Sequence, residues 1–171
     1  NYLSNCIDST WVSSGGNFVN KFSKQISKFT GVSYSVPVSS GTSALRMALL
    51  SLNVNAGDEV LVPAFTFVAS ANSISHIGAI PNFIDVEYET LGIDPIKLEK
   101  YLNNKIIFKN NFPINKHTGA KISALIAVHV YGNSCNINEI SKICEKFNIN
   151  VIEDCAGALG TFAKSGLDYK H

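Results

Sequence analysis

The chain has 171 residues, of which 46% are apolar and 16% charged, and its formal net charge is +1. This composition excludes a disordered chain, and the small net charge gives no bulk attraction to nucleic acid or anionic lipid. No apolar run is long enough to span a bilayer, so we expect no membrane partner and a cytoplasmic location. The four cysteines form no CxxC pair and the four histidines are scattered, so we expect reduced thiols and no metal site.

Short apolar segments alternate with segments of helical periodicity along most of the chain. Apolar residues at intervals of three and four predict a helix over residues 17–30 that ends at Gly31. Residues 103–121 are polar and contain Pro113 and Gly119, which predicts a surface excursion that could hold a hairpin. The other predicted elements are strands at 34–38, 59–62, 80–86, 122–128 and 150–152 and helices at 42–52, 67–77, 95–102 and 137–147.

Strands that alternate with helices and are apolar on both faces indicate an α/β fold, with a mostly parallel sheet flanked by helices. In such sheets, ligands bind beyond the carboxyl ends of the strands. Four segments with polar or aromatic residues follow predicted strands: residues 39–43, 63–67, 129–132 and 153–155. These strand ends are therefore the places where a binding site is expected.

The segment Ser39-Ser40-Gly41-Thr42-Ser43 lies between a predicted strand and a predicted helix. Free backbone N–H groups and the helix dipole make such a loop suitable for a phosphate. An ordinary helix cap is the alternative, because Ser and Thr are favoured at that position. No GxGxxG motif and no Walker lysine are present, so neither ATP nor NAD is indicated.

Three further strand-end residues each allow two interpretations. Asp154 could keep a ring nitrogen protonated, or it could cap a helix or form a salt bridge. Phe67 could stack on a flat ring, or it could be a core residue. His129 could lie near a catalytic site, or it could be a structural histidine. Taken together, the loop at residues 39–43, the aromatic Phe67 and the carboxylate of Asp154 are the features that pyridoxal phosphate requires.

The same motifs, in the same order, resemble the sugar aminotransferases of the DegT/DnrJ/EryC1/StrS family. The matching segments are residues 40–45, 57–60, 63–72, 78–81, 85–86, 129–132 and 153–160. Within the family, residues 11–19 and 115–119 are most similar to enzymes that aminate UDP-linked 4-keto-6-deoxy-N-acetyl sugars of the bacillosamine and legionaminic acid type.

The resemblance implies an aspartate aminotransferase-like fold (fold type I), of which residues 1–171 would be a single partial domain, the N-terminal part of the large domain. It implies that Gly41, Thr42 and Ser43 hold the cofactor phosphate, that Phe67 stacks on the ring and that Asp154 pairs with the ring nitrogen. The implied reaction transfers an amino group from glutamate to a nucleotide-linked sugar ketone for surface-polysaccharide synthesis. The implied assembly is a homodimer.

Two departures from the family pattern matter. The family often has Gln or His, which contacts the cofactor ring hydroxyl, where this chain has Gly157. The Schiff-base lysine of the family lies beyond the Glu-Asp motif, and Lys164 and Lys170 match no catalytic position, so we expect the chain to end before it and to be inactive alone. The alternatives are a pyridoxal-phosphate-dependent sugar 3-dehydratase, in which histidine replaces that lysine, and a non-catalytic remnant or regulator.

Overall fold

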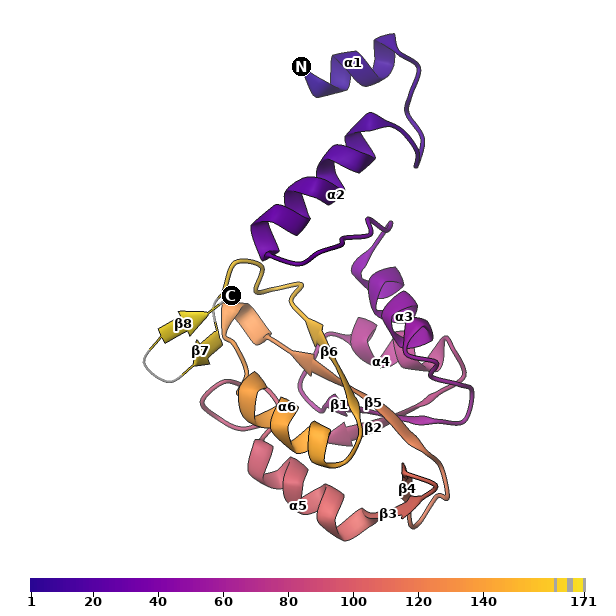
Figure 1. Ribbon diagram of the computed structural model, residues 1–171, viewed down its shortest axis with the longest axis vertical. Helices are drawn as coiled ribbons and strands as arrows, with labels where there is room; N and C mark the ends of the chain where they lie inside the picture. Colours follow the sequence, from indigo (N-terminus) through magenta and orange to yellow (C-terminus); the bar gives the residue numbers. More distant parts are fainter. Residues whose placement is uncertain (162, 166–167, 171) are drawn as a thin grey trace. The chain divides into compact units, whose positions relative to one another are not determined.

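The computed structural model describes residues 1–161, 163–165 and 168–170, with side chains for residues 1–161. The chain divides into two compact units, residues 1–38 and residues 39–171. The first unit contains helices α1 (Tyr2–Asp8) and α2 (Asn17–Thr30), shown in Figure 1. Helix α2 ends as predicted, because Gly31 follows it in the left-handed conformation, with a φ of 75°. No residue of either helix is buried.

The strand predicted at residues 34–38 is wrong, since this segment has no regular structure. Its alternating aromatic and β-branched residues suit a strand, but Tyr34 is 89% exposed and Val36 is also exposed. Within the described part of the chain no strand pairs with it. An extended segment without a neighbouring strand lacks the hydrogen bonds that define a sheet.

A four-stranded parallel sheet forms the centre of the second unit. Its order is β2 (Ile80–Ile84), β1 (Glu59–Pro63), β5 (Ile122–Val128) and β6 (Asn150–Asp154). Every pairing in this sheet is parallel, which confirms the predicted α/β class. All residues of β5 are buried, as expected for a strand covered on both faces.

Two pairs of helices cover the two faces of this sheet (Figure 1). Helices α3 (Gly41–Ser51) and α4 (Val68–Ser75) pack on one face, and α5 (Pro95–Lys105) and α6 (Ile137–Lys146) pack on the other. Because side chains alternate along a strand, Val60 and Val62 face α3 and α4, whereas Leu61 faces α5 and α6. The same alternation sends Asp154 and Glu153 of β6 to opposite faces.

The polar excursion does contain a hairpin, formed by β3 (Ile106–Lys109) and β4 (Phe112–Asn115). The two residues between these strands, Asn110 and Asn111, have φ values of 49° and 64°. Positive φ at both positions is typical of the tight type I′ turn, and asparagine tolerates it better than most residues.

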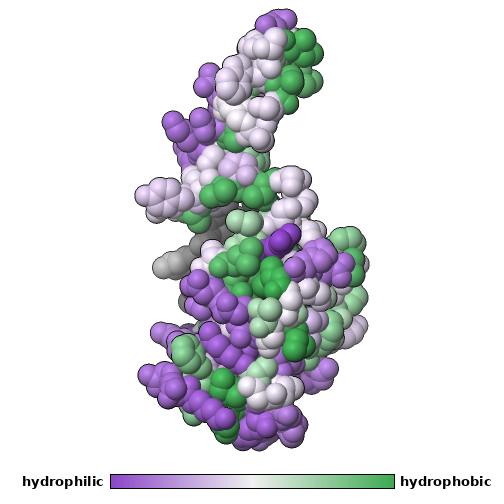
Figure 2. Space-filling model, turned by 90° about the vertical axis from the view of Figure 1, so that its right-hand side faces the viewer, coloured by the Kyte–Doolittle hydropathy of each residue, from purple (hydrophilic) through white to green (hydrophobic). Residues whose placement is uncertain are grey.

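The remaining elements are short. A 3-10 helix, η1 (Val130–Gly132), follows β5, and β7 (Ala163–Ser165) pairs with β8 (Asp168–Lys170) in an antiparallel ribbon. Among the described helices, none has the length and apolar character needed to cross a membrane. Figure 2 shows apolar patches between hydrophilic ones at the surface, in keeping with the many large apolar side chains that are exposed.

Candidate active site

The carboxyl ends of β1, β5 and β6 border a cavity of about 300 Å³. Because the strands are parallel, these ends lie at the same edge of the sheet, where ligands of α/β proteins bind. The cavity is lined by residues 65–67, by residues 128–131 and by Asp154, Ala156 and Gly157. The structure therefore brings together three of the four strand ends that the sequence indicated.

Asp154 is the acidic residue of the cavity, and its carboxylate is held at both oxygens. The hydroxyl of Ser70 on α4 donates to Oδ2 at 3.2 Å, and the backbone N–H of Ala156 donates to Oδ1 at 3.1 Å. Asp154 belongs to no ion pair among the residues whose side chains are described. Each carboxylate oxygen has about two acceptor sites, so both retain capacity for a further donor.

Aromatic side chains border the same cavity. Phe67 directly precedes α4 and is 78% exposed, which excludes its alternative interpretation as a core residue. Phe65 lies edge to face with Tyr131, with the ring centroids 6.4 Å apart. Exposed rings around a concave site offer apolar faces on which a flat ligand can stack.

The loop at residues 39–43 forms the start of α3, and Ser40 is its cap. The side chain of Ser40 accepts a hydrogen bond from the backbone N–H of Ser43 at 3.2 Å, so the helix-cap interpretation is correct for Ser40. Within the described structure, the N–H groups of Gly41 and Thr42 have no acceptor. These two groups and the helix dipole remain available to an anion.

Residues 41–43 do not line the cavity described above. Helix α3 nevertheless packs beside β6, on the sheet face to which Asp154 points. The start of α3, with its two free N–H groups, is thus separate from the cavity but belongs to the same unit and the same face of the sheet as Asp154.

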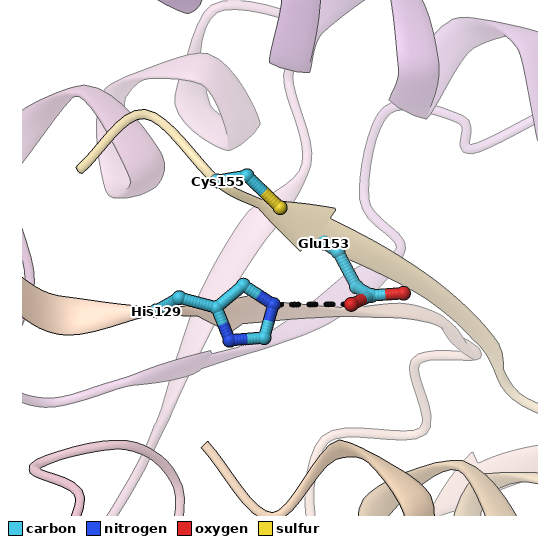
Figure 3. Close-up of side chains that lie close together, drawn as sticks. All are labelled: His129, Glu153 and Cys155. Atoms are coloured by element: carbon cyan, nitrogen blue, oxygen red, sulfur yellow. Dashed lines mark hydrogen bonds and ion pairs between the residues drawn. The ribbon is translucent and has the colours of Figure 1, made fainter. Parts of the chain in front are cut away.

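His129 is buried, and both of its ring nitrogens have partners. Nε2 lies 3.0 Å from a carboxylate oxygen of Glu153, as Figure 3 shows, and Nδ1 accepts a hydrogen bond from the backbone N–H of Cys135 at 3.2 Å. Cys135 belongs to the core on the α5 and α6 side, so the imidazole points away from the face that Asp154 occupies. The structural interpretation of His129 is therefore the one that its geometry favours.

Two influences act on the protonation of His129. The side chain of Cys135, and then those of Cys155 and Glu153, raise the pKa of His129 to about 12, whereas burial acts to lower it. The donor at Nδ1, however, requires a lone pair on that nitrogen, which places the single ring proton on Nε2, facing Glu153. A protonated Nδ1 would meet the backbone N–H of Cys135 at 3.2 Å, so this contact opposes the rise in the pKa of His129.

The same constraint bears on metal binding. Ligand atoms of His129, Glu153 and Cys155 lie within 4.8 Å of one another (Figure 3), a convergence that the sequence did not indicate. A metal ion on Nε2 would leave the ring proton on Nδ1, opposite the N–H of Cys135. The described geometry therefore suits a hydrogen-bonded structural cluster better than a metal site.

Gly157 lines the cavity without a side chain. A Cβ built on it would lie 3.7 Å from the carbonyl oxygen of His129 and 3.8 Å from the nitrogen of Tyr131, which are ordinary contacts. The backbone thus does not require glycine here, and the absent side chain leaves room inside the cavity.

The chain belongs to the DegT/DnrJ/EryC1/StrS aminotransferase family, whose model matches residues 1–166. It is 38% identical over 160 residues to GDP-perosamine synthase of Vibrio cholerae, covering 94% of this chain but only 39% of that enzyme. This chain therefore spans about two fifths of the length of such a relative.

Two solved structures illustrate the similarity in fold. NtdA of Bacillus subtilis, with its cofactor PMP bound, matches with a TM-score of 0.72 and 29% sequence identity. The match covers 85% of this chain and 30% of the NtdA chain. A mutant of the dehydratase ColD, with bound GDP-perosamine, matches with a TM-score of 0.76 and 25% sequence identity. The match covers 97% of this chain and 40% of the ColD chain.

The aminotransferases of this family depend on pyridoxal phosphate. The described residues fit a group of that kind: the cavity offers an exposed aromatic side chain, Phe67, and an oriented carboxylate, Asp154. In the described structure, two N–H groups at the start of α3 have no acceptor and lie on the same face of the sheet. The side chains of residues 162–171, which include Lys164 and Lys170, lie outside the described structure.

Proposed function

We propose that the whole protein containing this chain transfers an amino group to a nucleotide-linked 4-keto-6-deoxy sugar, with pyridoxal phosphate as cofactor. The observation that carries the proposal is the oriented carboxylate of Asp154 in an aromatic-lined cavity at the strand ends, in a chain of this family. The amino-sugar names of its relatives support the substrate class.

In this proposal each residue has a defined role. When bound, pyridoxal phosphate supplies an electron-withdrawing ring that carries the amino group between donor and acceptor. Asp154 would accept a hydrogen bond from the ring nitrogen and keep it protonated, and Phe67 would stack on the ring face. The N–H groups of Gly41 and Thr42 and the hydroxyl of Ser43 would hold the phosphate.

The finer parts of the proposal rest on the family resemblance. They are glutamate as the amino donor, a UDP-linked substrate, a homodimer, a cytoplasmic location and a role in surface-polysaccharide synthesis. The Schiff-base lysine would lie in the part of the protein that follows this chain.

A sugar 3-dehydratase is the second candidate, and the structural similarity to ColD favours it over a non-catalytic role. The two enzyme classes would share Asp154, Phe67 and the start of α3. They would differ at the Schiff-base position, which is lysine in the aminotransferases and histidine in the dehydratases. Analysis of the product separates the two classes, because an amino sugar has gained an amino group whereas a dehydration product has lost water.

The test is to replace Asp154 by Ala in the whole protein and to follow amino-sugar formation from glutamate. Because the substitution removes the counter-charge of the ring nitrogen, we expect the turnover to fall roughly a hundredfold or more, with unchanged circular dichroism. Asp85→Ala is the control, since Asp85 makes only an exposed ion pair with Lys97. Near-normal turnover of Asp154→Ala would refute the role of Asp154, and amination of the GDP-linked but not the UDP-linked sugar would refute the proposed nucleotide.

A further inference from the structure

Ser70 is a polar residue for which the family resemblance assigns no role. It lies in the first turn of α4, is fully buried, and donates a hydrogen bond from Oγ to Oδ2 of Asp154 at 3.2 Å. Its hydroxyl also lies 2.9 Å from that of Thr66, which lines the cavity. A buried hydroxyl with partners on both sides is fixed in orientation, unlike a solvated one.

The direction of these hydrogen bonds follows from the chemistry of the groups. An ionised carboxylate can only accept, so the single proton of the Ser70 hydroxyl points to Asp154. The hydroxyl of Thr66 must then be the donor to Ser70. The result is an ordered relay from Thr66 through Ser70 to the carboxylate.

Among the side chains that the structure describes, residues 1–161, the carboxylate has no charged partner that could do the same. Helices α3 and α4 cover this face of the sheet, and Arg46 is the one ionisable residue within them, with its side chain exposed. The neighbours of Asp154 in sequence, Glu153 and Cys155, belong to the His129 cluster, which faces the α5 and α6 side. The orientation of Asp154 therefore depends on two neutral donors, Ser70 at one oxygen and the N–H of Ala156 at the other.

We infer that Ser70 is a positioning residue, whose buried hydroxyl, oriented by Thr66, holds the Asp154 carboxylate toward the ring nitrogen of a bound pyridine cofactor. The inference rests on the proposed function, because it assumes that the ring nitrogen is what Asp154 contacts. The inference adds that Ser70 acts only through Asp154. An effect of Ser70 on cofactor binding can therefore be distinguished from a general contribution of Ser70 to folding.

Helix α4 supplies a matched control. Ser73 is as fully buried as Ser70, but its hydroxyl donates to the backbone carbonyl of Ser70, at 2.8 Å, and does not contact Asp154. Ser70→Ala and Ser73→Ala thus remove the same atom from the same helix at the same depth. Only the first removes a donor from the carboxylate.

The experiment measures the dissociation constants of two probes by calorimetry, pyridoxamine 5′-phosphate and its deaza analogue, in which carbon replaces the ring nitrogen. Neither probe has an aldehyde, so neither forms a covalent bond to lysine. We expect the wild type to prefer the nitrogen-containing probe. Ser70→Ala should weaken binding of that probe by roughly tenfold, since a hydrogen bond to a charged group is lost, and should leave the analogue within about twofold. Ser73→Ala should change neither.

The outcomes separate the inference from the proposed function. A wild type that binds both probes equally, or neither, contradicts the pairing of Asp154 with a ring nitrogen, and the inference falls with it. A wild type with the expected preference, combined with a Ser70→Ala variant that loses affinity for both probes equally or for neither, overturns the inference alone. Thr66→Val tests the relay further, because it should reduce the preference for the nitrogen-containing probe. An unchanged preference would show that Thr66 does not orient Ser70.

Discussion

At the scale of single residues, a substitution of Phe67 should affect cofactor binding but not the stability of the fold. The residue is 78% exposed, so it contributes little apolar burial to the folded chain. We expect Phe67→Ala to weaken the binding of pyridoxal phosphate by about 1–3 kcal/mol, through lost stacking and burial of the ring. The free energy of unfolding should change by less than about 0.5 kcal/mol. Titration calorimetry and urea denaturation of the same variant measure the two quantities.

Phe83 provides the control for this substitution. It is also a largely exposed phenylalanine, but it lies on β2 and does not line the cavity. Phe83→Ala should therefore leave the affinity for the cofactor unchanged. If the two variants lose affinity equally, the effect of Phe67 is not stacking.

The residues of the candidate site were predictable where the strand-end rule applies and not elsewhere. Asp154 and Phe67 stand directly at or after apolar strands, so their positions followed from the order of the elements. Ser70 did not, because its contact with Asp154 joins residues 84 positions apart and depends on the rotation of α4 against β6. The convergence of His129 and Glu153 is hidden for the same reason, since it depends on the register of β5 against β6.

At the scale of elements, the sequence predicted best those segments whose local signals agree with their packing. Strand β5 was predicted with its observed limits because a continuous apolar run needs cover on both faces, which the sheet provides. The segment at residues 34–38 has the composition of a strand but no neighbour among the described strands. The short helix α1 was not predicted, because seven residues are too few for a helical period to be recognised.

The hairpin β3–β4 is attached to the sheet through Glu59, whose side chain is almost fully buried, with 2% exposed. Its carboxylate accepts hydrogen bonds from Asn82 and Asn115 at one oxygen and from Thr118 at the other. Glu59→Ala leaves three donors without this acceptor, and the amide of Asn115 among them is buried, so we expect a loss of about 1–3 kcal/mol in the free energy of unfolding. Denaturation in urea would measure it.

Glu59→Gln should be milder, because an amide can replace both halves of the carboxylate. Its oxygen can accept from Asn82 and Asn115, and its NH₂ group can donate to the hydroxyl of Thr118. Glu59 begins β1, at the end opposite the cavity, so neither variant should change cofactor affinity. Equal losses of stability for Ala and Gln would show that the hydrogen bonds to Glu59 contribute little.

At the scale of the whole molecule, the buried apolar side chains all belong to the unit formed by residues 39–171. Both hydrophobic clusters lie against the parallel sheet, one on each face. Helix α2, in the other unit, is amphipathic but buries none of its residues, and Phe22 and Phe29 on its apolar side are exposed. The upper part of Figure 2, which contains α1 and α2, accordingly shows apolar atoms beside hydrophilic ones.

This difference predicts two levels of stability within the chain. An isolated helix of 14 residues is marginal in water, so the amides of α2 should open without unfolding of the sheet. Those of β5 should open only when the whole unit unfolds. Hydrogen exchange followed by mass spectrometry should therefore give rates in α2 that exceed those in β5 by roughly a hundredfold or more. Phe22→Ser should not affect exchange in β5, whereas Ile126→Ser, in the core, should accelerate it. Protection of α2 equal to that of β5 would mean that its apolar face is covered in solution, and Phe22→Ser should then release that protection.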